Sequence, residues 1–193
     1  GQPEVNVIGL DDVLSNIEKA KNDSNIVGIY LKGGVLSGGF ASMKEIRDAL
    51  LDFKSTGKFI VAYADTYAQS NYYLASVADK ILLNPSGMLE LKGLSAELMF
   101  FKNTLDKLGI EMQVVRVGTF KSAVEPFMNT KMSDANRLQV NTYISSIWNT
   151  LVNGIADSRK IAADQLNAYA DEMMLFQSPE KYKAYNLIDS LVY

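Results

Sequence analysis

Residues 26–64 read IVGIYLKGGVLSGGFASMKEIRDALLDFKSTGKFIVAYA, and the pattern in this stretch decides the fold class. Its two ends, 26–31 and 58–64, are short continuous apolar runs, which are typical of strands buried on both faces of a sheet. Between them lie a glycine-rich turn at 32–40 and a segment at 41–54 whose apolar residues recur at helical spacing. A strand, a crossover helix and a second strand predict two parallel neighbours in one sheet.

The same alternation of short apolar runs and helical patterns continues along the rest of the chain. The further helices that we expect lie at 10–22, 69–78, 96–108, 133–160, 163–169 and 179–185, and the further strands at 81–83, 88–91, 111–117 and 187–192, with a turn at 84–87 and irregular chain at 118–130. Ser133 and Asn136 suit the start of the longest helix as a weak cap. This order predicts an α/β fold with a mostly parallel sheet, flanking helices and a weak β-β-α rhythm, in a single domain over residues 1–193.

The absence of histidine and cysteine narrows the chemistry of the chain. It excludes a Ser-His-Asp triad, histidine-ligated metals, thiol nucleophiles, thiolate zinc sites and disulfides within these residues. We therefore expect no metal and no cofactor, and any acid–base chemistry has to use Asp, Glu, Lys or Tyr. The net charge of −3 gives no electrostatic footprint for nucleic acid. Because no run of 18 apolar residues occurs, we expect no membrane span within these residues.

Two segments follow a predicted buried strand in a position that suits binding or attack on a substrate. The glycine pairs Gly33-Gly34 and Gly38-Gly39 can point backbone N–H groups at a phosphate or a developing oxyanion, or they simply permit a tight turn. Ser70 lies at the start of a short helix, where N–H donors and the helix dipole favour a nucleophile. The alternative for Ser70 is an exposed serine in a first helical turn.

Lys121 is the third candidate, in the segment VVRVGTFKSAVEPFM at 114–128. A free lysine is neutral in only about one molecule in two thousand at pH 7, because its pKa is near 10.4. Burial among apolar neighbours such as Val117 and Phe120 would disfavour the ammonium and allow Lys121 to act as general base towards a serine hydroxyl. The alternatives are a surface lysine on a loop and a lysine paired with Glu125.

The segment RVGTFKSAVEPF at 116–127 resembles the lysine-bearing segment of the long form of the signal peptide peptidase A family, also called protease IV. The match is long and specific. The Gly38-Gly39 pair, QSNYYLASVAD at 69–79 and AYNLID at 184–189 resemble other parts of the same family, so the resemblance covers essentially the whole chain. It implies the ClpP/crotonase fold, which is built from stacked β-β-α units.

The resemblance also implies that the catalytic pair is divided between two domains. Long-form members contain two tandem copies of this domain, of which the N-terminal copy keeps the lysine and the C-terminal copy carries the serine. This chain is similar to the N-terminal copy, because aligning Tyr72-Tyr73 on the family's Ser-Gly-Gly-Tyr-Tyr stretch places Gln69 at the serine position. Ser70 then falls one residue late, and about 100° of helix rotation separates it from the position of the nucleophile.

Lys121 is the catalytic residue that the resemblance assigns to this chain, with Ser122 and Glu125 holding its loop and Gly39 left as a structural relic of an oxyanion site. The implied enzyme is a serine endopeptidase that degrades cleaved signal peptides at the membrane, and the chain alone is expected to be inactive. The implied partners are the C-terminal serine-bearing domain of the same protein, signal peptide substrates and further copies in a homo-oligomer, which is a tetramer in the family. The implied location is the bacterial inner membrane, with this soluble domain on the periplasmic side of an anchored protein.

Two rival functions stay open from the sequence. A crotonase-like acyl-CoA enzyme would use the glycine turn to polarise a thioester, but we find no carboxylate placed after that turn to handle protons. A structural copy that only assembles an oligomer would need no catalytic lysine.

Overall fold

The computed structural model describes residues 8–33, 38–113 and 121–193. The chain divides into two compact units. One comprises Gly1–Gly93 with Leu151–Tyr193, and we call it the sheet unit; the other comprises Leu94–Thr150, and we call it the lysine unit because it carries Lys121. The single domain over residues 1–193 stays a prediction.

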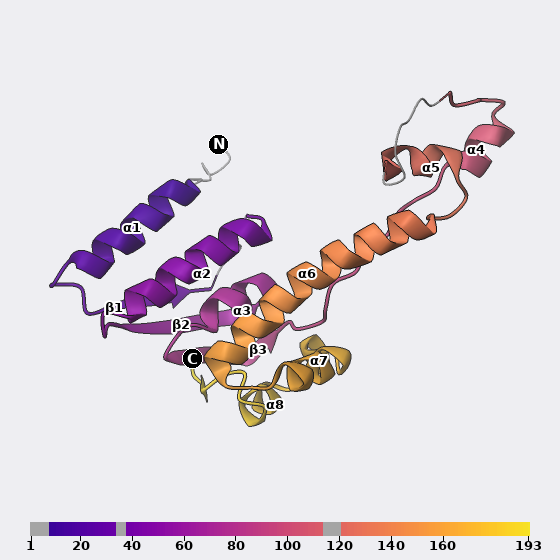
Figure 1. Ribbon diagram of the computed structural model, residues 1–193. Helices are drawn as coiled ribbons and strands as arrows, with labels where there is room; N and C mark the ends of the chain where they lie inside the picture. Colours follow the sequence, from indigo (N-terminus) through magenta and orange to yellow (C-terminus); the bar gives the residue numbers. More distant parts are fainter. Residues whose placement is uncertain (1–7, 34–37, 114–120) are drawn as a thin grey trace, which may run out of the picture. The chain divides into compact units, whose positions relative to one another are not determined.

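The sheet unit is built on four parallel strands in the order β1-β2-β3-β4 (Figure 1). These strands are β1 (Gly28–Lys32), β2 (Phe59–Tyr67), β3 (Lys80–Leu89) and β4 (Ser190–Leu191), and each pairs with the next. Parallel neighbours require crossover connections, and helices lie between the strands in the sequence. The predicted α/β class, with a mostly parallel sheet and flanking helices, is confirmed.

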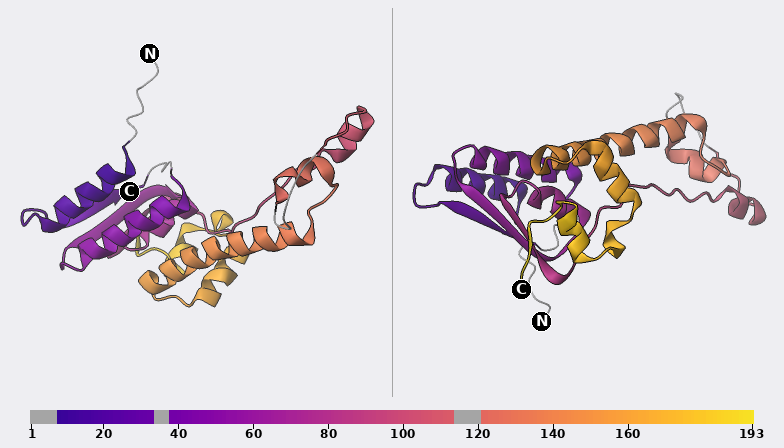
Figure 2. Two further views of the ribbon diagram at one scale, coloured as in Figure 1. Left: turned by 45° about the horizontal axis from the view of Figure 1, so that its top comes forward. Right: turned by 90° about the horizontal axis from the view of Figure 1, so that it is seen from below.

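Helices of the sheet unit flank this sheet (Figure 2). They are α1 (Leu10–Asn22), α2 (Phe40–Lys54), α3 (Gln69–Ala75), α7 (Ala163–Asp171), α8 (Pro179–Ala184) and the last turns of α6 (Asp134–Arg159). The bounds of α1 coincide with the prediction, and the others differ from it by a few residues. In β2, Ile60, Ala62 and Ala64 are buried together with Phe53 of α2, whereas Phe59 is half exposed on the other face.

The region around residues 84–87 corrects the prediction of two short strands separated by a turn, because the structure has the single strand β3 there. The turn is present as a bulge of four residues between Leu83 and Met88, where β2 has one residue between the two partner positions, so β3 carries three extra residues. The N–H of Ser86 donates to Oδ1 of Asn84 at 2.9 Å within this bulge. The strand resumes after the bulge because β2 runs on beyond it and still offers backbone partners.

The lysine unit contains short elements, namely α4 (Lys102–Lys107), the 3₁₀ turn η1 (Ser122–Val124), α5 (Glu125–Met128) and the first turns of α6. The helix predicted at 96–108 is therefore wrong in length. Met99 is 71% exposed and Leu108 is exposed as well, and a short helix without tertiary packing is marginal in water. Of the strand predicted at 111–117, residues 111–113 are not in a strand and the rest lies outside the described residues.

Helix α6 is the longest element, as predicted, and it begins directly after Ser133. The N–H of Asn136 donates to Oγ of Ser133 at 3.2 Å, which confirms the predicted cap. None of the described helices, α6 included, has both the length and the apolar character that crossing a membrane requires.

Two aspartates connect the beginnings of neighbouring strands. Asp79 directly precedes β3, and its Oδ2 accepts the N–H of Ile60 at 2.8 Å while its own N–H donates to the carbonyl of Ile60 at 2.8 Å. Asp189 directly precedes β4 and forms the same pair of bonds with Ile81, at 2.7 and 2.9 Å. Each carboxylate therefore holds one strand in register with the strand before it.

Each of these carboxylates also holds a cation from the end of a helix. Lys54 of α2 lies 2.8 Å from Asp79, and Arg159 of α6 lies 2.9 Å from Asp189. Burial acts to raise the pKa of Asp189, but hydrogen bonds from Arg159 and from the N–H of Ile81 outweigh it and hold the pKa below its ordinary value. Because Arg159 is only 8% exposed, loss of the Asp189 carboxylate would leave a buried guanidinium without its counter-charge.

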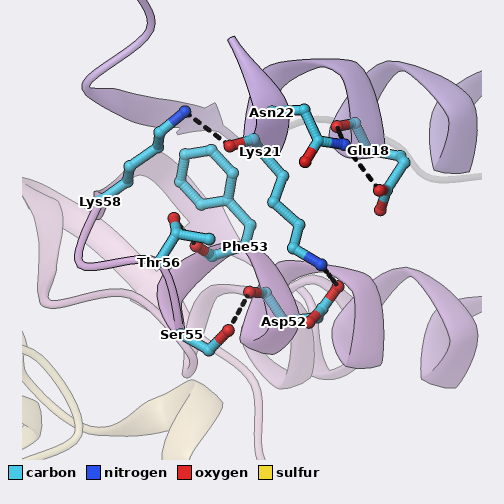
Figure 3. A network of polar contacts seen from close by, with 8 residues as sticks. All are labelled: Glu18, Lys21, Asn22, Asp52, Phe53, Ser55, Thr56 and Lys58. Atoms are coloured by element: carbon cyan, nitrogen blue, oxygen red, sulfur yellow. Dashed lines mark hydrogen bonds and ion pairs between the residues drawn. The ribbon is translucent and has the colours of Figure 1, made fainter. Parts of the chain in front are cut away.

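Helix α1 contributes no fully buried residue and is held by polar contacts near its end (Figure 3). Nζ of Lys58 donates to the carbonyls of Ala20, Lys21 and Asp23 at 2.7, 2.8 and 2.7 Å. Lys21 in turn lies 2.6 Å from the carboxylate of Asp52 in α2. A cation at the C-terminus of a helix binds its last carbonyls and suits its dipole, so Lys58 fixes where α1 ends.

Arg47 of α2 joins three helices through a buried guanidinium. It donates to Oγ of Ser76 at 2.7 Å and Oγ of Ser158 at 2.6 Å, and also to the carbonyls of Tyr73 and Gly154. Burial lowers the pKa of Arg47, because it removes water from the charged guanidinium. The end of α3 and the last turns of α6 are thereby tied to α2.

We expect Asp189→Asn to lower the free energy of unfolding at pH 7 by about 2–3 kcal/mol, because it removes the charge that partners Arg159. The pKa of Asp189 is depressed on folding, so its stabilisation is present above the ordinary carboxyl range near pH 4 and is lost as pH falls through the folded value. The difference between variant and wild type should therefore shrink below about pH 3 in urea titrations. The exposed Asp171→Asn is the matched control, and an equal loss in both variants would contradict the role of Asp189.

Candidate active site

The residues that the sequence singled out fall in both units. Gly38-Gly39, Gln69 and Ser70 belong to the sheet unit, whereas Lys121 belongs to the lysine unit.

Lys121 is exposed, directly before the 3₁₀ turn η1. The residues that precede it in the matching segment, 116–120, lie outside the described residues, and so do Val117 and Phe120 of the predicted apolar surroundings. Among the neighbours that follow, Val124 is partly buried and Phe127 is exposed. Burial, the condition the sequence proposed for a neutral amine, is therefore not provided by the described part of the chain.

The loop that carries Lys121 is anchored on its C-terminal side. Glu125 is 2% exposed, and its Oε2 accepts the N–H of Ser133 at 3.1 Å and Nδ2 of Asn136 at 3.0 Å, while Oε1 accepts the hydroxyl of Ser133 at 2.5 Å. The N–H of Phe101 donates to the carbonyl of Pro126 at 2.7 Å, so the loop is also held to the start of α4. The chain on one side of Lys121 is thus fixed firmly.

Gln69, at the position that resembles the family's nucleophile, is 6% exposed at the start of α3. Its Oε1 accepts the N–H of Lys92 at 2.9 Å and its Nε2 donates to the carbonyl of Gly93 at 3.2 Å. The backbone N–H of Gln69 donates to Oε2 of Glu90 at 3.2 Å. The side chain is therefore occupied by the backbone that leaves β3, and its amide is no nucleophile.

Ser70 and Tyr72 follow Gln69 in α3 and differ in their surroundings. Ser70 is partly buried one residue further along α3. Tyr72 is fully buried and donates its hydroxyl to the carbonyl of Leu187 at 2.7 Å, and burial raises its pKa well above the ordinary value. A phenol held in this way is a poor proton carrier near neutral pH.

The glycine-rich turn has a structural glycine at its start. The N–H of Gly33 donates to the carbonyl of Tyr63 at 2.6 Å, and a Cβ at Gly33 would lie 2.3 Å from the Cβ of Ala64. Gly39 differs, because its φ of −75° suits any residue and a Cβ there would meet nothing within 4 Å. Close packing therefore explains Gly33, whereas nothing in the described structure requires a glycine at position 39.

A mostly apolar cavity of about 340 Å³ lies beside this turn within the sheet unit. Its walls come from α1, β1, α2 and α3, and include Ile17, Leu31, Leu50, Asn71 and Leu74. In the described part of the chain, no group of three or more Asp or Glu side chains could hold a metal ion.

Sequence reasoning missed the partners of Gln69. Glu90 lies 21 residues further on and receives the first N–H of α3 in place of a side-chain cap. No local signal links two positions so far apart, because the contact depends on where β3 ends.

We expect Gln69→Ala to lower the free energy of unfolding by about 1–3 kcal/mol, because the N–H of Lys92 and the carbonyl of Gly93 would lose their partners. Gln165→Ala, at an exposed position of α7, is the matched control and should change stability little. Urea unfolding of both variants measures the difference. Equal stability of the two variants would show that the amide of Gln69 does not hold this segment.

Comparison with known proteins places the chain in a family. Residues 52–193 match Peptidase family S49. The chain is 39% identical to Protease 4 of Haemophilus influenzae over 156 residues, which are 80% of this chain and 25% of that protein. It is 40% identical to Protease 4 of Salmonella typhi over 158 residues, which are 81% of this chain and 26% of that protein.

A plant relative extends the same likeness. The chloroplastic serine protease SPPA of Arabidopsis thaliana is 30% identical over 186 residues, which are 96% of this chain and 27% of that protein. The chain thus spans about a quarter of the length of these curated relatives. With its parallel sheet and flanking helices, the chain belongs to peptidase family S49, whose fold is ClpP/crotonase-like.

Proposed function

We propose that this chain contributes the general base, Lys121, to a serine endopeptidase whose nucleophilic serine belongs to a second, C-terminal domain of the same protein. The observation that carries the proposal is the state of position 69, where a buried glutamine is bonded to Lys92 and Gly93. A chain that keeps the lysine segment but has lost the nucleophile requires a serine from elsewhere. The relatives named Protease 4 and serine protease SPPA are about four times as long as the matching region, which leaves room for another domain.

The proposed reaction balances with one lysine and one serine. The neutral amine of Lys121 takes the proton from the serine hydroxyl as Oγ forms a bond to the peptide carbonyl carbon. The C–N bond then breaks, the ammonium of Lys121 returns the proton to the leaving amine, and an acyl-enzyme remains. Water hydrolyses that ester with the same lysine as base. The chain alone, lacking the serine, is inactive in this scheme.

The proposed substrates are signal peptides that have been cut from their proteins, which are apolar segments released at a membrane. The lysine unit supports this choice, because Phe101, Phe127 and Met128 expose apolar surface on the elements that hold the Lys121 loop. The rings of Phe101 and Phe127 stack with centroids 6.0 Å apart, which keeps that surface in place. The whole protein is proposed to be a homo-oligomer anchored in the bacterial inner membrane, with this domain on the periplasmic side.

Lys121→Ala in the full-length protein is expected to lower kcat for a fluorogenic apolar peptide by about 10²–10⁴-fold, as expected for removal of a general base. Lys121→Arg should be equally inactive, because a guanidinium stays charged. Lys131→Ala, at an exposed position ten residues further on, is the control and should keep wild-type activity. Full activity of Lys121→Ala would exclude the proposed role and favour a structural or oligomerising copy.

A serine-directed fluorophosphonate tests the division of the site. We expect the 193-residue chain to remain unlabelled, because Ser70 is turned away from the nucleophile position, and the full-length protein to be labelled outside this region. Peptide mapping of the labelled protein identifies the acylated serine. Stoichiometric labelling of Ser70 would place the nucleophile in this chain and overturn the proposed division.

A further inference from the structure

Glu125 is an unusual residue in the described chain, because it is a carboxylate with 2% exposure. Burying a carboxylate is costly unless hydrogen bonds replace its hydration. The sequence placed Glu125 inside the lysine segment, four residues after Lys121, and the proposed reaction gives it no part in proton transfer. Its hydrogen bonds show what replaces the lost hydration.

Both carboxylate oxygens of Glu125 are used at the beginning of α6. Oε1 accepts the hydroxyl of Ser133 at 2.5 Å, and Oε2 accepts the N–H of Ser133 at 3.1 Å and the amide of Asn136 at 3.0 Å. Asn136 is itself buried, so its amide depends on this acceptor. The N-terminus of a helix favours negative charge, and α6 has 26 residues. These donors and the N-terminus of α6 therefore favour the ionised carboxylate of Glu125.

These bonds reach Lys121 through a very short connection. The 3₁₀ turn Ser122–Val124 alone separates Lys121 from Glu125, which begins α5. The N–H of Asn129 donates to the carbonyl of Glu125 at 2.8 Å and closes α5 on the other side. With three residues in a single turn between them, a shift of Glu125 displaces the backbone of Lys121 as well.

We propose that Glu125 is a positioning residue for the lysine, whose carboxylate fixes the Lys121 loop against the start of α6 and so sets where the amine meets the serine. This inference rests on the proposed function of Lys121. Glu125 does not touch the reacting atoms in this scheme. It acts by holding the backbone, and small displacements of a catalytic group from its reactive geometry are costly in rate.

Steady-state kinetics of the full-length Glu125→Ala protein test the proposal. We expect kcat to fall by about 10–100-fold with KM within about twofold, because the loss concerns the chemical step. We also expect the acidic limb of the kcat–pH profile to move to higher pH, because a displaced amine is better hydrated and harder to deprotonate. A role in stability alone would lower the amount of folded enzyme and leave the midpoint of that limb unchanged.

Glu125→Gln and Asp134→Ala complete the test. The single oxygen of the glutamine can still accept from Ser133 and Asn136, so Glu125→Gln should retain most of the activity and serves if Glu125→Ala does not fold. Asp134→Ala removes an exposed carboxylate from the same helix end and should leave kcat and the pH profile unchanged. A wild-type kcat and pH profile in Glu125→Ala, or a loss of kcat with an unmoved limb, would overturn the inference.

Lys121→Ala, measured beside these variants, separates the two proposals. An inactive Lys121→Ala with a fully active Glu125→Ala would remove only the positioning role. An active Lys121→Ala would remove the proposed function itself, whatever Glu125→Ala shows.

Discussion

A carboxylate that bonds to an N–H at the beginning of the neighbouring strand is the interaction on which the sheet unit depends. A parallel sheet is sensitive to register, because a slip of one residue turns every side chain to the other face. Asp79 and Asp189 prevent such a slip at β3 and β4 by bonding to Ile60 and Ile81. The effect is largest at β4, because that strand contributes only two paired positions and Asp189 supplies further bonds beside them.

The register of β2 and β3 determines the surroundings of position 69. Tyr67 pairs with Leu89 and accepts the N–H of Glu90 at 2.8 Å, so the end of β3 lies beside the start of α3. Glu90 can then receive the first N–H of α3, and Gln69 can bond to the backbone that follows it. A small side chain here would leave buried donors and acceptors without partners, which explains a side chain with both a donor and an acceptor at position 69.

The periodic patterns predicted most helices and strands of the sheet unit, because buried residues recur at regular spacing along them. Helix α1 and the parallel pair β1 and β2 follow from local sequence, and Ser133 was recognised as a cap from its spacing to Asn136. The predictions fail where the structure depends on contacts between residues far apart in the sequence, or on the lack of such contacts. The helix at 96–108 shortened because its apolar stripe is exposed, and the buried contacts of Arg47 join residues up to 111 positions apart. The catalytic assignment of Lys121 came from the resemblance and stays a prediction.

The state of Lys121 and the state of Gln69 are explained together if the active site is divided. A general base has to be neutral when it acts, whereas a lysine in water is almost always an ammonium at neutral pH. The described chain leaves Lys121 exposed while it fixes the loop after it through Glu125, so the position of the lysine is prepared but its desolvation is not. In the proposed enzyme the serine-bearing domain supplies that desolvation along with the nucleophile. Docking of the two domains would then create the base and present the serine in one step, and an unassembled chain would have neither.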